Sequence, residues 1–305
     1  IALKSIVSGT YNLVVVDIAN NCCYTTNDHA GSLPIYYSRL QGGLIISTNP
    51  VAILNSEAIN TSVDLVGFAE WIYIGCTIGE RYMIREIKNT LPDRTLVWNA
   101  ENSSFKIEAN PDSPWEIVPD TWKPTIDDLA DTFIEGCKRI SRIVSQPAHF
   151  QSSGKDSRLI LAAWPNQYKL DCYTYGDPDS LEVGIAKSIA ELKGSNWKHV
   201  WLDGDKVTEN LLSLFNACGM IIWPDRWFTA RRMSKDGYSW TTDGFWGNVQ
   251  IHPGGYDCEK YFSTLSKLAS YLTIFIDQKV SKIGLDRITE AMNYHMHKTH
   301  FSYPN

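Results

Sequence analysis

The sequence lacks both an excess of basic residues and a long apolar segment. Among its 305 residues, 28 Lys and Arg stand against 34 Asp and Glu, which gives a formal net charge of -6. No basic run is long enough to follow a phosphate backbone. The apolar runs, such as Leu13 to Val16, are far shorter than the roughly 20 residues of a membrane-spanning helix. We therefore expect neither nucleic acid nor a membrane as a partner.

Cysteine is also sparse and follows no recognisable pattern. The seven cysteines are an odd number, and their spacing matches no zinc site. Free thiols of this kind suit a reducing compartment, so we expect a cytoplasmic protein. The chain begins at Ile1, without a Met or a charged and then apolar leader, which indicates a cut N-terminus rather than a targeting signal.

The first third of the chain is rich in β-forming residues. Short runs between residues 11 and 110 are bounded by turn residues, including the pairs Asn20-Asn21 and Gly42-Gly43, and predict an antiparallel β-rich layer. One helix is expected from Asp64 to Tyr73, with Asp64 as its N-cap. Four prolines between 111 and 124 favour a boundary there, which divides the chain into domains 1–112 and 113–305.

The remainder alternates between helical and strand-like patterns. Such alternation predicts an α/β fold with a parallel sheet, whose ligands bind beyond the carboxyl ends of the strands. The expected helices are 126–144, 155–164, 178–193 and 206–218, and the expected strands are 149–152, 170–175, 199–202, 220–223 and 238–242.

The first strand-to-helix turn of this second domain is the strongest candidate for chemistry. Small residues let the backbone approach a phosphate, hydroxyls and a Lys add donors, and the amide groups of a helix N-terminus attract anions. The single carboxylate of Asp156 would repel phosphate unless Mg²⁺ stands between them. The same residue types also form ordinary caps and turns. The loop consists of Ser152, Ser153, Gly154, Lys155, Asp156 and Ser157.

Several segments resemble glutamine-hydrolysing asparagine synthetases. SSGKDS at 152–157 is similar to the Ser-Gly-Gly-x-Asp-Ser loop of the PP-loop ATP pyrophosphatase superfamily, and 173–194 resembles the strand and helix that follow it. NDHAGSLPIYYSRLQGGLIISTNPVAIL at 27–54 resembles the end of a class II glutamine amidotransferase domain, and 70–98 resembles the segment between the two domains. The order of these features matches the family.

The resemblance implies a fold and an activity. The fold would be a PP-loop (adenine nucleotide alpha hydrolase-like) domain preceded by a partial, antiparallel β-rich amidotransferase domain. The activity would be that of a carbon-nitrogen ligase with ATP and Mg²⁺ as cofactors: a small-molecule carboxylate, aspartate or an analogue, is adenylated, pyrophosphate leaves, and ammonia or an amine attacks. Ser152, Gly154, Asp156 and Ser157 would hold the pyrophosphate, Asp156 would also bind the metal and take part in catalysis, and Ser153 and Lys155 complete the loop. Lys155 is equally well explained as a solvated side chain.

A second ATP-binding loop of the family falls on residues 241–248. Asp243 would be catalytic and Gly244 would bind the nucleotide, although a plain turn is an equal alternative. The family's metal-binding Asp falls on Trp246, which favours a non-catalytic nucleotide-binding protein unless Asp243 or Asp257 compensates. The family's glutaminase nucleophile is an N-terminal Cys that this chain lacks, so we expect no glutamine hydrolysis. Cys22 and Cys23 are expected to be packed thiols. Relatives that close macrolactams or amidate surface-sugar acids remain an alternative, and the oligomeric state and the carboxylate stay open.

Overall fold

The computed structural model describes residues 9–109, 123–219, 223–244, 282–283 and 286. They fall into two compact units. The first is built mainly from residues 9–109 with the short segment Ala217–Gly219, and the second from residues 123–216 and 223–244. The predicted domain boundary between residues 112 and 113 lies outside the described residues and stays a prediction.

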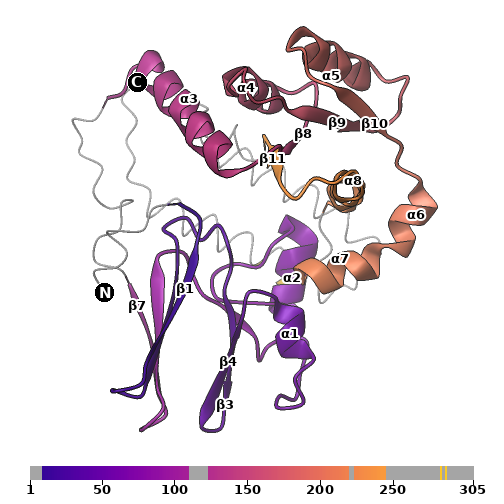
Figure 1. Ribbon diagram of the computed structural model, residues 1–305. Helices are drawn as coiled ribbons and strands as arrows, with labels where there is room; N and C mark the ends of the chain where they lie inside the picture. Colours follow the sequence, from indigo (N-terminus) through magenta and orange to yellow (C-terminus); the bar gives the residue numbers. More distant parts are fainter. Residues whose placement is uncertain (1–8, 110–122, 220–222, 245–281, 284–285, 287–305) are drawn as a thin grey trace. The chain divides into compact units, whose positions relative to one another are not determined.

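The first unit contains two antiparallel sheets (Figure 1), with strand orders β1-β2-β6-β7 and β4-β3-β5. Positive φ angles at Asn21 (51°) and Gly42 (79°) form the tight turns that the two residue pairs predicted. The antiparallel layer is thus confirmed. Its strands are β1 (Asn12–Asp17), β2 (Cys22–Asn27), β3 (Tyr36–Leu40), β4 (Gly43–Ser47), β5 (Lys88–Asn89), β6 (Arg94–Asn99) and β7 (Ser104–Ala109).

Two helices accompany these sheets, α1 (Pro50–Leu54) and α2 (Leu65–Ile74). The side chain of Asp64 caps α2 as predicted, because its carboxylate accepts from the backbone N–H groups of Val66 and Gly67 at 3.0 and 3.1 Å. The short helix α1 was not predicted. Its Ile53 packs in a core cluster with Tyr36, Tyr82 and Ile87, all buried.

The second unit is organised around one parallel sheet of order β10-β9-β8-β11. This confirms the parallel sheet predicted from the alternating pattern. Its strands are β8 (Ala148–Phe150), β9 (Asp171–Tyr175), β10 (Trp197–Val200) and β11 (Thr241–Asp243), and its helices are α3 (Ile126–Ile143), α4 (Lys155–Ala163), α5 (Leu181–Leu192), α6 (Gly204–Glu209), α7 (Leu211–Cys218) and α8 (Pro224–Lys235).

Helices cover both faces of this sheet (Figure 1). Adjacent residues of a strand point to opposite faces. Cys172 accordingly packs with Leu161 of α4, in a cluster that also holds side chains from α3 and α5. Tyr173 packs with Met233 of α8 on the other face. The sheet is therefore the middle layer of an α/β/α sandwich.

The structure corrects three sequence predictions in this unit. The helix expected at 206–218 is two helices, α6 and α7, because Asn210 ends α6 with its amide bonded to the Lys206 carbonyl at 2.6 Å. Trp223, expected to end a strand, instead precedes the unpredicted helix α8, which Pro224 begins. Strand β10 begins at Trp197, two residues before the predicted start. Residues 220–222 lie outside the described residues.

Candidate functional site

The sheet of the second unit has one point where the direction of strand addition reverses. From β8 the chain adds β9 and then β10 on one side, whereas β11 lies on the other side of β8. In open α/β sheets, ligands bind in the crevice outside the carboxyl ends of the strands at such a switch point. Phe150 and Asp243, which end β8 and β11, pair with each other. Gln151 and Gly244, the residues that follow these two strand ends, therefore begin side by side.

The loop after β8 forms a hydrogen-bonded turn into α4. The Ser157 hydroxyl is buried and accepts from the backbone N–H of Ser152 at 3.2 Å, and the two hydroxyl oxygens lie 3.0 Å apart. The N–H of Gly154 donates to Ser152 Oγ at 3.1 Å. Gly154 is the N-cap of α4 and provides no side-chain cap, so the first turn of the helix presents backbone amides. The structure thus brings these three predicted residues together.

The other two residues of the loop have different environments. Ser153 Oγ donates to a carboxylate oxygen of Glu182, in the first turn of α5, at 3.3 Å. Lys155 is exposed at the start of α4, where its side chain adds positive charge near the loop without a fixed geometry.

Gly244 lies directly against the N-terminus of α4. A Cβ atom at this position would stand 2.4 Å from the backbone nitrogen of Ser157 and 2.6 Å from the carbonyl carbon of Asp156. Only glycine allows such an approach. The two predicted nucleotide loops, separated widely in the sequence, therefore meet backbone to backbone.

Asp243 is engaged by a cation. Its carboxylate forms an ion pair with the guanidinium of Arg226 on α8. Next to this pair, burial and then a hydrogen bond to Asp225 raise the pKa of Tyr175 to about 12, while Arg226 acts in the opposite direction. The predicted catalytic Asp243 is consequently held in a cluster of charged and phenolic groups at the carboxyl edge of the sheet.

Gln151 follows β8 directly and is only 2% exposed. Its Nε2 donates to the backbone oxygen of Ser152 at 2.5 Å and to Ser157 Oγ at 3.2 Å. Because a carbonyl only accepts, the nitrogen must face Ser152, and Oε1 is left as a buried acceptor without a partner among the residues that the structure describes. Such an atom costs about 1–3 kcal/mol, which a donor from water or a ligand would offset.

His149 joins three elements beneath the loop. It is fully buried on β8, with Nε2 at 3.0 Å from the backbone oxygen of Ser157 and Nδ1 at 2.8 Å from Thr242 Oγ1. Nε2 must carry the proton because the carbonyl only accepts, so Nδ1 accepts from Thr242. Burial lowers the pKa of His149 to about 4. A neutral imidazole therefore ties α4 and β11 to β8.

This arrangement predicts a loss of stability in acid. The unfolded imidazole protonates near its ordinary pKa of 6.5, whereas the folded one stays neutral down to about pH 4. The unfolded state binds more protons in this window, so stability falls by roughly 3 kcal/mol as the pH is lowered through it. Urea unfolding at successive pH values should show that the free energy of unfolding of His149→Gln changes less with pH than that of the wild type. His199→Gln removes a histidine from β10 of the same sheet and is the control for the substitution itself. Equal slopes in all three proteins would contradict this account.

Asp156, the predicted magnesium ligand, lies half-buried in the first turn of α4. Across the described ranges, no three His, Cys, Asp or Glu side chains converge into a group that could hold a metal ion. Magnesium is commonly held by one or two carboxylates together with phosphates and water, so a nucleotide site does not require such a group. The predicted metal ligand stays a prediction, and Trp246 and Asp257 lie outside the described residues.

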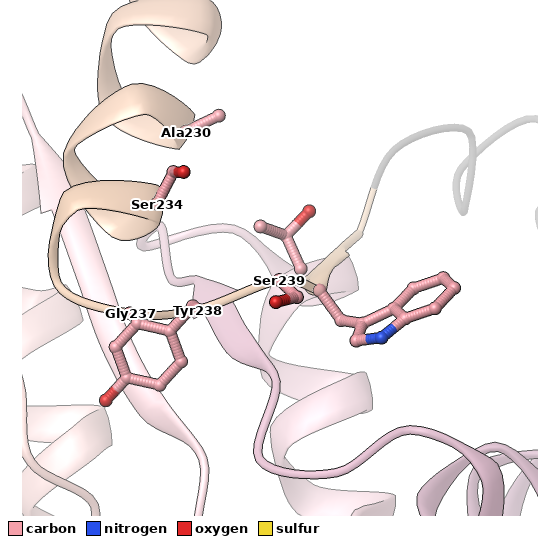
Figure 2. Close-up of a pocket in the computed structure, with 7 residues that line it drawn as sticks. Ala230, Ser234, Gly237, Tyr238 and Ser239 are labelled. Carbon is pink, nitrogen blue, oxygen red and sulfur yellow. The ribbon is translucent and has the colours of Figure 1, made fainter.

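A pocket of about 450 Å³ lies away from these residues (Figure 2). Ala230 and Ser234 of α8 line it from one side, and the segment from Gly237 to Thr241 lines it from the other. Since Thr241 is the first residue of β11, the pocket lies at the amino end of this strand. None of the predicted site residues lines it.

Comparison with known proteins identifies the first unit. Residues 2–108 match the family described as glutamine amidotransferase domain, and no curated protein matches the chain. The matched residues coincide with the two antiparallel sheets. This match supports the amidotransferase part of the predicted resemblance. No helix in the described ranges has the length and apolar character needed to cross a bilayer.

Two adjacent cysteines of the first unit lie on a strand. Both Cys22 and Cys23 belong to β2 and are partly buried. Asn99 donates to Cys22 Sγ at 3.3 Å, and Cys23 Sγ lies 3.9 Å from Thr25 Oγ1. These contacts agree with the prediction that both are packed thiols.

Sequence reasoning missed Arg226, Gln151 and His149 as parts of the site. His149 and Gln151 were assigned only to a strand. Arg226 was missed together with its helix. The sequence does offer a signal for His149 and Gln151: they are polar residues on either side of Phe150, and strands of a parallel sheet are usually apolar because both faces are buried.

Proposed function

We propose that the second unit binds ATP with Mg²⁺ in the crevice between the carboxyl ends of β8 and β11, and adenylates a small-molecule carboxylate for attack by ammonia or an amine. One observation carries the proposal. The two loops that resemble the nucleotide loops of asparagine synthetases meet at the switch point of a parallel sheet, where Gly244 touches the N-terminus of α4. The match of residues 2–108 to a glutamine amidotransferase domain also supports it, because such a domain precedes the ATP-binding domain in the family that the chain resembles.

The residues of the crevice fit a metal-bound nucleotide. The loop offers the hydroxyls of Ser152 and Ser157 and the uncapped amides of α4 as donors. Gln151 Oε1 is a buried acceptor that lacks a donor. Asp156 is the carboxylate that would hold Mg²⁺, and the cation would spread the negative charge that develops on the leaving pyrophosphate.

In the proposed reaction the chain's own groups bind and orient. An oxygen of the substrate carboxylate forms a bond to the α-phosphorus as the bond from that phosphorus to the bridging oxygen breaks, and pyrophosphate leaves with the electron pair. Ammonia or an amine then attacks the acyl carbon, loses a proton and expels AMP. Donors fixed on the loop would stabilise the departing phosphate oxygens without reorganising.

A non-catalytic nucleotide-binding protein is the second candidate. Two backbone amides of the loop, those of Ser152 and Gly154, already donate to neighbouring hydroxyls, and Asp243 is engaged by Arg226. Both arrangements must change before these groups can contact a phosphate or a metal. They favour a protein that binds a nucleotide without turnover.

Exchange of labelled pyrophosphate into ATP separates the two candidates. The ligase is expected to catalyse exchange that depends on Mg²⁺ and on a carboxylate, with aspartate tested first and a panel of amino and sugar acids afterwards. Binding of ATP, measured by calorimetry, without exchange for any carboxylate would favour the non-catalytic protein. Absence of ATP binding would remove both proposals.

A further inference from the structure

Arg226 belongs to α8 and meets residues at the carboxyl ends of two strands of the parallel sheet. Its guanidinium pairs with Asp243, the last residue of β11. It also interacts with Tyr175, the last residue of β9. Strands β9 and β11 flank β8, and neighbouring strands lie about 4.8 Å apart. The guanidinium therefore lies near the carboxyl end of β8, where the chain enters the loop through Gln151.

The surroundings hold the guanidinium in place. Besides the ion pair with Asp243, its carbon lies 5.6 Å from the centre of the Trp223 ring, within the range of a cation–π contact. The side chain is 32% exposed, so a ligand in the crevice can reach it. The guanidinium keeps its charge and offers five donors in a planar fork that matches phosphate oxygens.

The crevice otherwise carries carboxylates that repel an anion. Asp156 and Asp243 lie on neighbouring segments, because Gly244, which follows Asp243, packs against the backbone of Asp156. Phosphate groups placed there need a compensating positive charge that is fixed in position. Lys155 is exposed, and a flexible ammonium provides charge without such a geometry.

We propose that Arg226 contacts the pyrophosphate part of the nucleotide, and that Asp243 positions it for this contact. The inference rests on the proposed function, because it assigns a residue to the same crevice. It adds a basic group on α8 to the glycine-and-serine loop after β8. Asp243 acts here through Arg226.

Calorimetric titration of the full chain with inorganic pyrophosphate and Mg²⁺ tests the proposal. Arg226→Gln is expected to weaken binding at least tenfold, since a charge-assisted hydrogen bond is lost. Arg226→Lys should give an intermediate affinity, because it keeps the positive charge and loses the planar set of guanidinium donors. Arg231→Gln is the matched control: it makes the same change on the same helix, where Arg231 pairs with Asn210, and should bind as the wild type does.

The double variant Arg226→Gln with Asp243→Asn distinguishes contact from neutralisation. If Arg226 touches pyrophosphate, removing the carboxylate as well leaves binding weak. Recovery of wild-type affinity in the double variant would overturn the proposal, as would unchanged affinity in Arg226→Gln. Circular dichroism must show that each variant is folded. If the wild type binds both ATP and pyrophosphate, and Arg226→Gln binds each of them with the wild-type affinity, only this inference fails. If the wild type binds neither ATP nor pyrophosphate, the proposed function fails as well.

Discussion

Replacing Asp156 by alanine is expected to abolish ATP-dependent release of pyrophosphate while leaving the protein folded. The carboxylate lies in the first turn of α4, beside the loop and Gly244. Losing a metal ligand that stabilises developing charge lowers turnover by a factor on the order of 10²–10³ or more. The structural cost is small, about 0.3–1 kcal/mol, because only a favourable interaction with the helix dipole is removed. A coupled assay for pyrophosphate and a thermal unfolding curve measure the two effects.

Asp127→Ala provides a matched control for this variant. Asp127 occupies the same position in the first turn of α3, so its removal should lower the free energy of unfolding by the same amount. Helix α3 contributes no residue to the loop. Turnover should then stay at the wild-type level. Comparable turnover in the Asp156 and Asp127 variants would exclude Asp156 from the chemistry.

Gly244→Ala is expected to destabilise the second unit and to eliminate nucleotide binding. The added methyl group would meet the backbone of Asp156 and Ser157 at 2.6 and 2.4 Å. Backbone atoms cannot rotate away as a flexible side chain can, so either β11 or the first turn of α4 must move. Overpacking of this kind costs about 1–3 kcal/mol. The displacement also separates the two loops. Urea unfolding and ATP titration measure the consequences.

The corresponding substitution at Gly184 should behave in the opposite way. Gly184 lies in α5, and a Cβ atom there would meet nothing within 4 Å. Alanine is the better helix former by about 1 kcal/mol, so Gly184→Ala is expected to raise the urea midpoint and to leave ATP binding unchanged. A Gly244 variant as stable as the Gly184 variant would show that the end of β11 accommodates the methyl group.

The sequence predicted what depends on local pattern. The helix at α3, the turn from β8 into α4 and the parallel sheet follow from periodicity and turn residues close together in the chain. Strand order and contacts between distant segments leave no pattern among neighbouring residues from which they could be predicted. His149 bonds to Thr242 across 93 residues. Arg226 meets Asp243 across 17 residues, and its helix begins after a residue with a positive φ angle, Trp223, in a segment whose apolar run favoured a strand.

The position of β11 has a consequence for how the second unit folds. This strand pairs with β8 at a separation of 93 positions in the sequence, and closing so long a loop is entropically costly and slow. During synthesis the segment around Ser152 emerges from the ribosome well before its partner Gly244. Binding competence should therefore arise last, after the neighbouring β8-β9-β10 ladder has formed, and nucleotide affinity would serve as a sensitive reporter of complete folding.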